Sequence, residues 1–415
     1  MKINKKNIKY TIDDHHHGLY VKEARLRLGY RLSEVADEIC DVSYLSKIEA
    51  GRMIPSVEVF EKIVEKLEIQ FPSEKQLCSV DLFRKALYQK DMNLILPYLT
   101  HETLHHYEIR MLEFFRYVEL GQLEKATVVK DEIDQFRFHF QPKKEQAYLL
   151  FAGVYHLKSC EWVKGKQHLE KSFKLMEKNK EEDPYLYLQL AKYYFRVEKA
   201  FIGFIWLERA TTEFRRMFEQ KWCFECDMLW CKESLNNGDV DAVEVKIEEW
   251  KKLLAPSYQN TQWDRIFNIT ALFHEKKENY ELAESYHLKS IEKTDRKIQE
   301  ICLIDTINFY YHRQKRAHLI KLIEKLNLSE LNAENRTLID FYYLKLTEEG
   351  SEFFESFLKK DAIPLAAKRL DRKKVILYTK ELTKYYRGKL SYKKLSDAYY
   401  ELEKFLDALS LAGKV

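Results

Sequence analysis

The chain has 415 residues, of which 46% are hydrophobic and 33% charged, and its formal net charge is +4. Only 11 residues are glycine and 7 proline, which argues against a β-rich or glycine-loop nucleotide-binding protein and favours long helices joined by short connections. The 24 Phe and 27 Tyr exclude a disordered chain, and the small net charge confines any nucleic-acid contact to one region. No apolar run suits a membrane span or a secretion signal, and the seven scattered cysteines form no disulfide framework, so we expect a cytoplasmic protein.

The segment 18–70 predicts four short helices separated by tight turns. The first ends at Gly29, the third covers 43–49 and ends at Gly51, and the fourth opens after Pro55. Two short helices at a sharp turn form the helix-turn-helix unit, whose second helix enters the major groove of DNA. This segment is therefore the predicted DNA-binding domain.

The third helix of this segment offers Leu45 and Ile48 to a core, which leaves small polar side chains and one lysine to face outward. Such a surface suits base edges and phosphates, and arginines before and after it add positive charge. A helical hairpin with solvated polar faces is the alternative interpretation. The residues predicted to contact DNA are Arg25, Arg31, Ser43, Tyr44, Ser46, Lys47 and Arg52.

The run LSKIEAGR over 45–52, followed by Pro55, resembles the helix-3 signature of Xre/Cro-type repressors, a resemblance that implies a five-helix domain. The stretch 38–49 is one residue shorter between its helices than in most of that family. It most resembles the peptide-pheromone regulators of the PlcR and NprR kind. Arg31 stands where the family usually has a helix-capping Ser or Thr, so the second helix is expected to begin at Ser33.

The segments that flank this domain carry weaker signals. Residues 1–17 contain four lysines and form either an arm along a minor groove or a flexible tail, and residues 71–103 are expected to form linker helices. His101, Glu102 and His105 match the H-E-x-x-H zinc-peptidase pattern. Because no later segment resembles a third-ligand helix, we interpret the match as coincidence, with a zinc peptidase as a rival class and no metal or cofactor expected.

From about residue 104, aromatic-rich helices alternate with short polar breaks at a spacing of roughly 38 residues, which is typical of stacked helical hairpins. Several units, most clearly 263–294, resemble tetratricopeptide (TPR) repeats. The predicted fold is therefore all-α, with the helix-turn-helix domain followed by a TPR-like right-handed α-solenoid over 104–415. The breaks are expected near Gly121, Glu161, Glu198, Gly238, Asn279, Gln314, Gly350 and Gly388.

The concave wall of such a solenoid is lined by the first helix of each pair and suits an extended peptide. Side chains that both donate and accept hydrogen bonds grip a peptide backbone, and Asn268 best matches the family position that does so. Exposed polar residues are the alternative for each candidate. The predicted peptide-binding residues are Gln189, Asp227, Arg265, Asn268 and Asn308. Tyr193, Tyr194 and Trp230 are assigned either to side-chain pockets or to the core.

Cys223, Cys226 and Cys231 lie close together in the sequence and raise the question of a zinc site. The aromatic residues between them indicate a continuous helix, whereas zinc needs a turn that brings the thiolates together and a second ligand pair. We therefore predict free buried thiols.

The resemblance extends over essentially all residues from 18 onward and implies a non-enzymatic transcription regulator. It implies a homodimer that reads an inverted-repeat operator and is controlled by a short, re-imported signalling peptide bound in the groove. The operator, the peptide and the sign of regulation stay open. The rival is a Rap-like TPR protein that acts on a response regulator, and a bifunctional protein would combine both activities.

Overall fold

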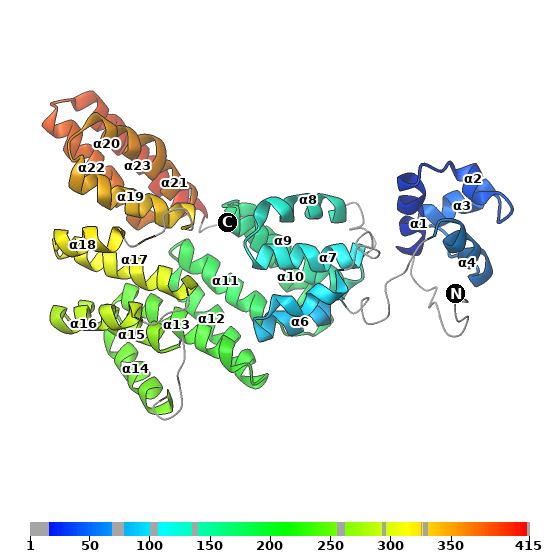
Figure 1. Cartoon of the computed structure of the whole chain (residues 1–415), viewed down its shortest axis with the longest axis horizontal. Coiled ribbons are helices and arrows are strands. Elements are labelled where there is room, and N and C mark those ends of the chain that lie inside the picture. Colours follow the sequence, from blue (N-terminus) through cyan, green and yellow to red (C-terminus); the bar gives the residue numbers. More distant parts are fainter. Residues whose placement is uncertain are drawn as a thin grey trace. The chain divides into compact units, whose positions relative to one another are not determined.

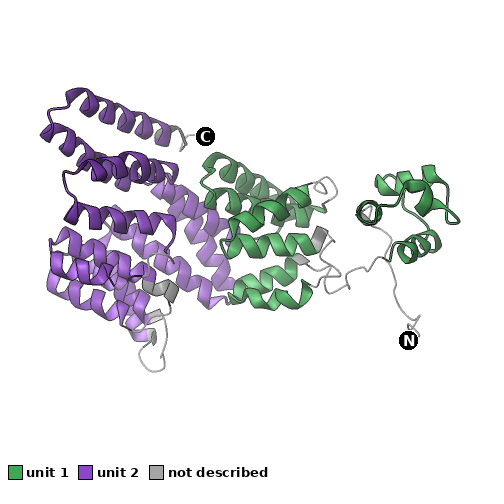
Figure 2. Cartoon of the chain, turned by 45° about the horizontal axis from the view of Figure 1, so that its top comes forward, with its two compact units in different colours: residues 1–182 green, residues 183–415 purple. Residues whose placement is uncertain are grey.

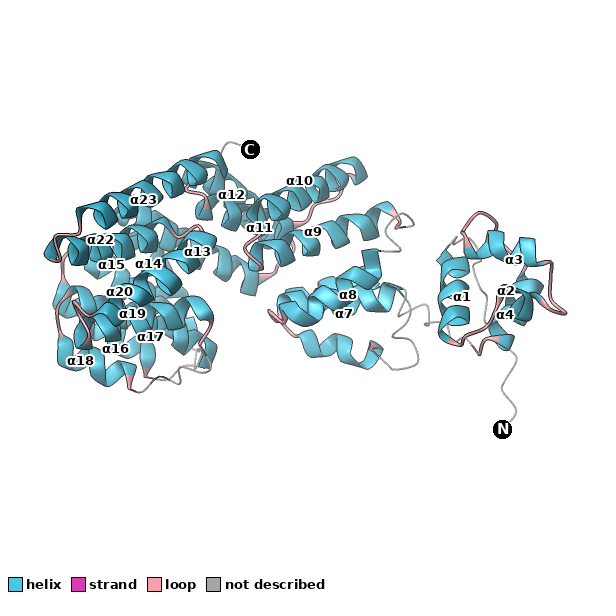
Figure 3. Cartoon of the chain, turned by 90° about the horizontal axis from the view of Figure 1, so that it is seen from above, coloured by secondary structure: helices cyan, strands magenta, loops and turns pink. Residues whose placement is uncertain are grey.

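The computed structural model of the chain is helical throughout the part that it describes, without a strand (Figure 3). It forms two compact units, residues 1–182 and 183–415 (Figure 2). None of the described helices is both long and apolar enough to cross a bilayer. The described residues are 16–68, 79–99, 107–134, 140–254, 262–292, 296–324, 326 and 331–412.

The helix-turn-helix segment contains the four predicted helices: α1 (His16–Arg27), α2 (Leu32–Ala36), α3 (Val42–Glu49) and α4 (Val57–Lys66) (Figure 1). Residues 69–78, where a fifth helix of this domain would fall, lie outside the described residues. One small hydrophobic cluster holds the four helices together. Its buried members are Val21, Ala24, Val35, Ala36, Leu45, Ile48, Phe60, Ile63 and Leu67.

Helix α2 begins at Leu32, one residue before the predicted Ser33, so that start was wrong by one position. Arg31 is the residue that precedes the helix, and its side chain cannot cap it. The Glu34 carboxylate accepts a hydrogen bond from the Arg31 backbone N–H at 2.5 Å, which supplies half of a capping box. The helix therefore starts sharply without the usual Ser or Thr.

The rest of the first unit begins with α6 (Ser79–Gln89) and the 3₁₀ helix η1 (Met92–Tyr98), which lie where linker helices were predicted. Two antiparallel pairs follow, α7 (Tyr107–Glu119) with α8 (Leu123–Asp134) and α9 (Pro142–Lys158) with α10 (Trp162–Asn179). Helices α9 and α10 cross where Gly153 faces Gly165, because neither residue has a side chain to separate the two backbones. The domain boundaries after residues 17, 70 and 103 stay a prediction.

The second unit continues as a stack of helical pairs, the TPR-like arrangement predicted from the sequence (Figures 1 and 2). Its first three pairs are α11 (Pro184–Arg196) with α12 (Ala200–Arg216), α13 (Gln220–Asn237) with α14 (Val240–Leu254), and α15 (Gln262–Lys276) with α16 (Tyr280–Ile291). The next are α17 (Arg296–His312) with α18 (Arg316–Ile323), and α19 (Ala333–Thr347) with the interrupted helix α20 (Glu352–Phe357), η3 (Leu358–Ala362) and α21 (Ile363–Lys368). The last pair is α22 (Arg372–Gly388) with α23 (Tyr392–Ala412).

The eight predicted breaks all coincide with turns inside these pairs, so that prediction is confirmed. Each turn contains one residue with a left-handed φ, which ends the first helix of the pair. Gly121, Gly238 and Gly350 take this conformation at little cost, whereas the other five turns use residues that carry a side chain. Those five are Cys160, Glu198, Glu278, Gln314 and Leu390.

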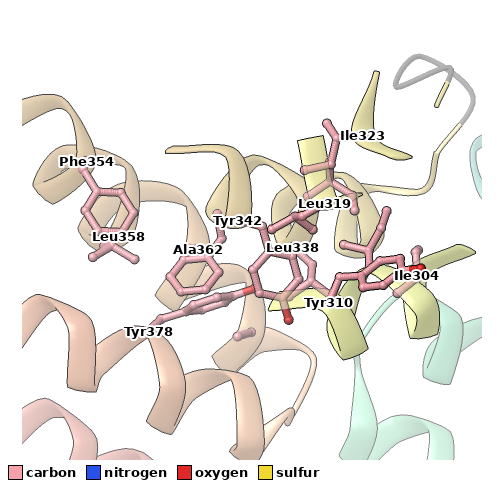
Figure 4. Close-up of a cluster of buried hydrophobic side chains, with 14 of the residues drawn as sticks. Ile304, Tyr310, Leu319, Ile323, Leu338, Tyr342, Phe354, Leu358, Ala362 and Tyr378 are labelled. Carbon is pink, nitrogen blue, oxygen red and sulfur yellow. The ribbon is translucent and has the colours of Figure 1, made fainter. Parts of the chain in front are cut away.

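The largest cluster at the C-terminal end of the second unit is rich in aromatic residues that fill the spaces between successive pairs (Figure 4). The rings of Phe341 on α19 and Tyr378 on α22 lie 4.8 Å apart, and Phe354 is buried beside them. This contact joins α19 to the following pair. The many Phe and Tyr residues of this cluster thus serve mainly to pack one repeat against the next.

Candidate nucleic-acid interface and repeat groove

Helix α3 presents the face that the sequence predicted. Leu45 and Ile48 are fully buried, while Ser43, Ser46 and Lys47 are exposed. Tyr44 is half-buried against the core of the domain, and Arg31 and Arg52 are exposed outside the helix. The structure therefore leaves six of the seven predicted DNA-contacting side chains at least partly accessible.

Arg25 is the exception, and the prediction that its charge faces DNA is wrong for this structure. The side chain is buried, and its Nε and one Nη donate to the two carboxylate oxygens of Glu49 at 2.7 and 2.9 Å. The other Nη donates to the Tyr30 carbonyl at 2.9 Å. The hydrogen bond to Glu49 raises the pKa of Arg25 above its ordinary value, so the guanidinium stays charged. This charge-assisted pair ties α1 to α3.

The position of α3 depends on two glycines. Gly18 on α1 lies directly against the Ile48 carbonyl, and a Cβ at Gly18 would overlap that oxygen. Gly51 has a φ of +65° and ends α3, because the Arg52 N–H then bonds to the Lys47 carbonyl at 2.9 Å. This turn brings Arg52 to the end of the helix that carries Lys47.

The second unit contains a cavity of about 850 Å³. Its lining comes mainly from the first helices of the pairs, as predicted for the concave side of a solenoid. Some lining residues lie on α11 and α13, and others on α17, α19 and the start of α22; we call these two groups the two walls of the cavity. The polar and charged lining residues include Lys192, Arg196, Lys232, Asp305, Asn308, Glu334, Asn335, Asp371 and Lys374.

Two of the five predicted peptide-binding residues belong to this cavity or contact its lining. Asn308 lines it and accepts a hydrogen bond from the Tyr342 hydroxyl at 2.5 Å. Asn268 is buried on α15, and its Nδ2 donates to the carboxylate of Asp305, a lining residue, at 2.9 Å. The Asn268 Oδ1 is buried without a hydrogen-bond partner, although buried polar atoms are normally paired.

The other three predicted residues do not line the cavity. Arg265 makes two hydrogen bonds to Glu225, at 2.6 and 2.9 Å, and Asp227 pairs with Lys246 at 3.1 Å. Gln189 is buried within α11. The contacts of Arg265 and Asp227 join neighbouring helices, and the assignment of all three residues to a peptide site stays a prediction. Tyr193 is buried too.

Sequence reasoning missed the charged residues at the rim of the cavity. Arg196 and Lys374 line it from α11 and α22, and Glu334 and Asp371 lie between them. Arg196 is the last residue of its helix, and Asp371 precedes α22, where its side chain accepts from the Lys374 N–H. A carboxylate before a helix is a capping signal in the sequence, but it does not reveal the partner across the groove.

The cysteines of α13 lie on one continuous helix, as predicted. Burial raises the pKa of the Cys226 thiol to about 12 and raises that of Cys231 as well, which disfavours the thiolate that zinc requires. The described residues contain no group of His, Cys, Asp and Glu arranged to hold a metal. The H-E-x-x-H sequence at 101–105 lies outside the described residues.

Comparisons with known proteins agree with this architecture. Residues 21–72 match the helix-turn-helix family model. The transcriptional activator NprA of Geobacillus stearothermophilus is 23% identical over 411 residues, covering 90% of this chain and 98% of its own. NprR in complex with its cognate peptide NprX has a TM-score of 0.58 at 17% identity, over 77% of this chain and 100% of that one.

A Rap protein complexed with competence and sporulation factor is similar in fold as well, with a TM-score of 0.60 at 12% identity. The match covers 82% of this chain and 100% of the Rap chain. Together these likenesses confirm the combination of a helix-turn-helix segment with a TPR-like solenoid.

Proposed function

We propose that this chain, a DNA-binding transcription regulator of the peptide-responsive helix-turn-helix and TPR family, is controlled by a short peptide in the cavity of its second unit. The observation that carries this proposal is the cavity between the first helices of the repeats, with amide side chains at its wall. The amide of Asn308 and the unpartnered Oδ1 of Asn268, whose Nδ2 donates to Asp305, are suited to a peptide backbone, which donates and accepts in alternation. Two proteins of similar fold have been solved as complexes, NprR with its cognate peptide NprX and a Rap protein with competence and sporulation factor.

The DNA half of the proposal places α3 in the major groove. Lys47 and Arg52 would contact phosphates, and Ser43, Tyr44 and Ser46 would face bases or sugar. A homodimer would set two α3 helices on the two halves of an inverted repeat. In each protomer the solenoid follows α3 along the chain. A peptide that favours one solenoid conformation would therefore change the distance between the two α3 helices of the dimer.

The DNA contact is tested by selection from random double-stranded oligonucleotides with the full chain. We expect an enriched inverted repeat, and footprinting on it should show protection of two half-sites. The single protected half-site of a monomer would contradict the homodimer. No enrichment over a chain whose α3 face is changed at Ser43, Ser46 and Lys47 would contradict sequence-specific binding.

Peptide binding is tested with a phage-displayed library of random linear peptides, selected against the full chain. Synthetic versions of the enriched peptides should bind with one-to-one stoichiometry and alter affinity for the selected DNA. Asn308→Ala should weaken peptide binding about tenfold. The variant loses the proposed uncharged hydrogen bonds between the amide and the peptide backbone, and the Tyr342 hydroxyl loses its acceptor. The exposed amide Gln167 on α10 provides the matched control, Gln167→Ala, which should leave binding unchanged.

A second candidate is action on a response regulator, which the fold likeness to a Rap protein favours. A purified, phosphorylated response regulator would then lose its phosphate, or form a stable complex, when mixed with the full chain. If the full chain selects a DNA sequence but neither dephosphorylates nor binds the response regulator, transcription regulation is its sole function.

A further inference from the structure

The second unit contains a set of polar contacts between segments that lie far apart in the sequence. They join the ends of α11 and α13 to residues 369–374, at the start of α22, across separations of 137 to 174 residues. All the residues belong to one compact unit. Stacked repeats normally contact only their neighbours along the chain, so these contacts are not part of ordinary repeat packing.

The inner contacts form a four-residue group of two cations and two carboxylates. The Arg196 Nε donates to the Arg369 carbonyl at 2.7 Å, and its guanidinium nitrogens lie 3.6 Å from Glu334 and 3.9 Å from Asp371. The Lys374 Nζ lies 2.7 Å from Glu334 and 3.3 Å from Asp371. These four side chains are 15% to 29% exposed, so water screens them less than it screens surface pairs.

The electrostatics of the group follow from this geometry. Burial alone would raise the pKa of Glu334, but Lys374, Arg196 and Arg369 lower it below its usual value. Glu334 therefore stays ionised and holds both cations. Removal of one cation would leave a half-buried carboxylate with weaker compensation.

Two outer contacts lie beside the inner group. The Arg372 guanidinium donates to the Glu198 carboxylate at 2.7 Å, and the Lys373 Nζ donates to the Asn236 Oδ1 at 2.9 Å. Glu198 is the left-handed residue in the turn after α11, so its place is set by the backbone. We call the inner and outer contacts together the latch.

The latch residues also line the cavity: Arg196, Glu198 and Asn236 belong to one wall, and Glu334, Asp371, Lys373 and Lys374 to the other. We propose that the latch holds the two walls at the separation that a ligand can bridge, so that latch closure and groove occupancy stabilise each other. An opening of a few ångströms at the latch would separate the α11 and α13 wall from the wall that carries Asn308. A ligand that touches both walls therefore binds the closed form more tightly, and by linkage it favours closure.

This inference rests on the proposed function for the identity of the ligand, but closure of the latch can be measured without one. Spin labels at Phe201→Cys and Ile376→Cys, two exposed positions close in sequence to latch residues, report the distance across the latch. The labels are placed in the full chain after its reactive native cysteines are replaced. With the latch intact we expect one narrow distance distribution. Arg196→Ala with Arg372→Ala should broaden it and shift it to longer distances.

Lys384→Ala with Arg387→Ala is the matched control, because it removes two exposed cations from the same last pair without touching the latch. It should leave the distribution unchanged. The exchange Glu198→Arg with Arg372→Glu should restore the narrow distribution that either single reversal broadens. Raised salt should act as the latch variant does, since ions screen the outer pair. A distribution that is the same in the latch variant, at high salt and in the control would overturn the inference.

The coupling is then tested with a peptide enriched from the random library. The latch variant should bind it about tenfold more weakly than the control, and the peptide should narrow the distance distribution of the variant. Equal affinities in the two variants would overturn the coupling even if the distances differ. If the library yields no peptide at all, the proposed function fails, whereas the distance measurement still decides whether the latch holds the walls.

Discussion

The helix-turn-helix segment and the second unit of the repeats use charge in opposite ways. In α1–α4 the buried pair of Arg25 and Glu49 holds two helices together, while Lys47 and Arg52 on the outer face stay exposed. In residues 183–415 many charged side chains are engaged by a neighbouring helix, as Arg265 is by Glu225 and Lys246 by Asp227. A surface that binds a polyanion needs accessible cations, whereas a stack of repeats uses ion pairs to fix one helix against the next.

The two regions also differ in how much each contact matters. Among its described residues, the small domain has one cluster of nine buried hydrophobic side chains, so the loss of a single interaction removes a large share of its stability. The repeat unit spreads its core over many helices, and a local defect affects mainly the adjacent pairs. All six tryptophans lie between residues 162 and 263. Tryptophan fluorescence therefore reports the repeats, and DNA affinity with far-UV circular dichroism reports the small domain.

The largest effect is expected from Glu49→Ala. The change leaves the Arg25 guanidinium buried without its carboxylate, which typically costs about 3–5 kcal/mol. Far-UV circular dichroism should show early melting of a small helical fraction, and DNA binding should be lost at ordinary temperature. The melting midpoint of the repeats, followed by tryptophan fluorescence, should stay as in the wild type.

Glu225→Ala is the matched change in the repeats, because it breaks an arginine pair in which each side chain is about a quarter exposed. We expect a cost of about 1 kcal/mol, since water solvates the freed guanidinium. Equal losses from the two variants would contradict the contrast between the regions.

Next in size is Gly18→Ala. The added methyl group would overlap the Ile48 carbonyl oxygen, and backbone has to move to relieve the clash, so we expect a loss of about 3 kcal/mol in the small domain. The comparison is Gly153→Ala in the repeats, where the new Cβ would lie 2.7 Å from a side-chain carbon of Leu169. A rotamer change of Leu169 relieves that contact, and the Gly165 carbonyl oxygen, 3.2 Å from the new Cβ, has to move by only a few tenths of an ångström. The midpoint of tryptophan-detected melting should therefore fall less than the midpoint of the small domain.

Local features of the sequence predicted the helices and turns well. Glycine and polar residues interrupt an otherwise apolar helical pattern, so the eight breaks could be located without any knowledge of tertiary contacts. The exposed face of α3 followed from the spacing of Leu45 and Ile48 alone. The start of α2 was misplaced by one residue, because the capping group came from Glu34 and not from the residue before the helix.

The surroundings of the candidate site residues were harder to predict, because the partners of these residues lie far away in the sequence. Arg25 was assigned to DNA from its charge, but Glu49 lies 24 residues later and removes that charge from the surface. The partners of Arg196 lie more than a hundred residues downstream, in units whose repeat pattern is degenerate. No local pattern records such a contact, so the charged rim of the groove required the structure.

A smaller effect is expected from Lys47→Ala with Arg52→Ala, which tests the exposed charges of the small domain. Loss of two phosphate contacts should weaken DNA binding and lower the slope of log K against log salt by about 1–2. Gel-shift titrations from low to moderate salt measure both quantities. Lys22→Ala with Lys62→Ala removes two cations elsewhere in the domain and is the control. An unchanged slope in the first variant would show that α3 does not lie against the phosphates.

The smallest effect concerns acid pH and belongs to the repeats. Burial lowers the pKa of His274 below its ordinary value of 6.5, and Lys251 lowers it further. Its ring stacks on Tyr286, and its Nδ1 is buried without a hydrogen-bond partner, so the fold favours the neutral ring. Near pH 6.5 the imidazole of the unfolded chain takes up a proton, whereas that of the folded chain stays neutral because its pKa is lower. The stabilisation is therefore complete above that pH and is lost as the pH falls below it.

His274→Gln should therefore flatten the fall in tryptophan-detected stability between pH 7.5 and 5. The change should be less than about 1 kcal/mol, because the ring is only partly buried and water screens its charge. His312→Gln, at an exposed position on α17, is the control and should keep the wild-type slope. The melting of α1–α4 should not respond to either variant, because both substituted histidines lie in the repeats and neither belongs to α1–α4. A flattened slope in that domain would mean that the two regions do not unfold separately, and the contrast between them would have to be abandoned.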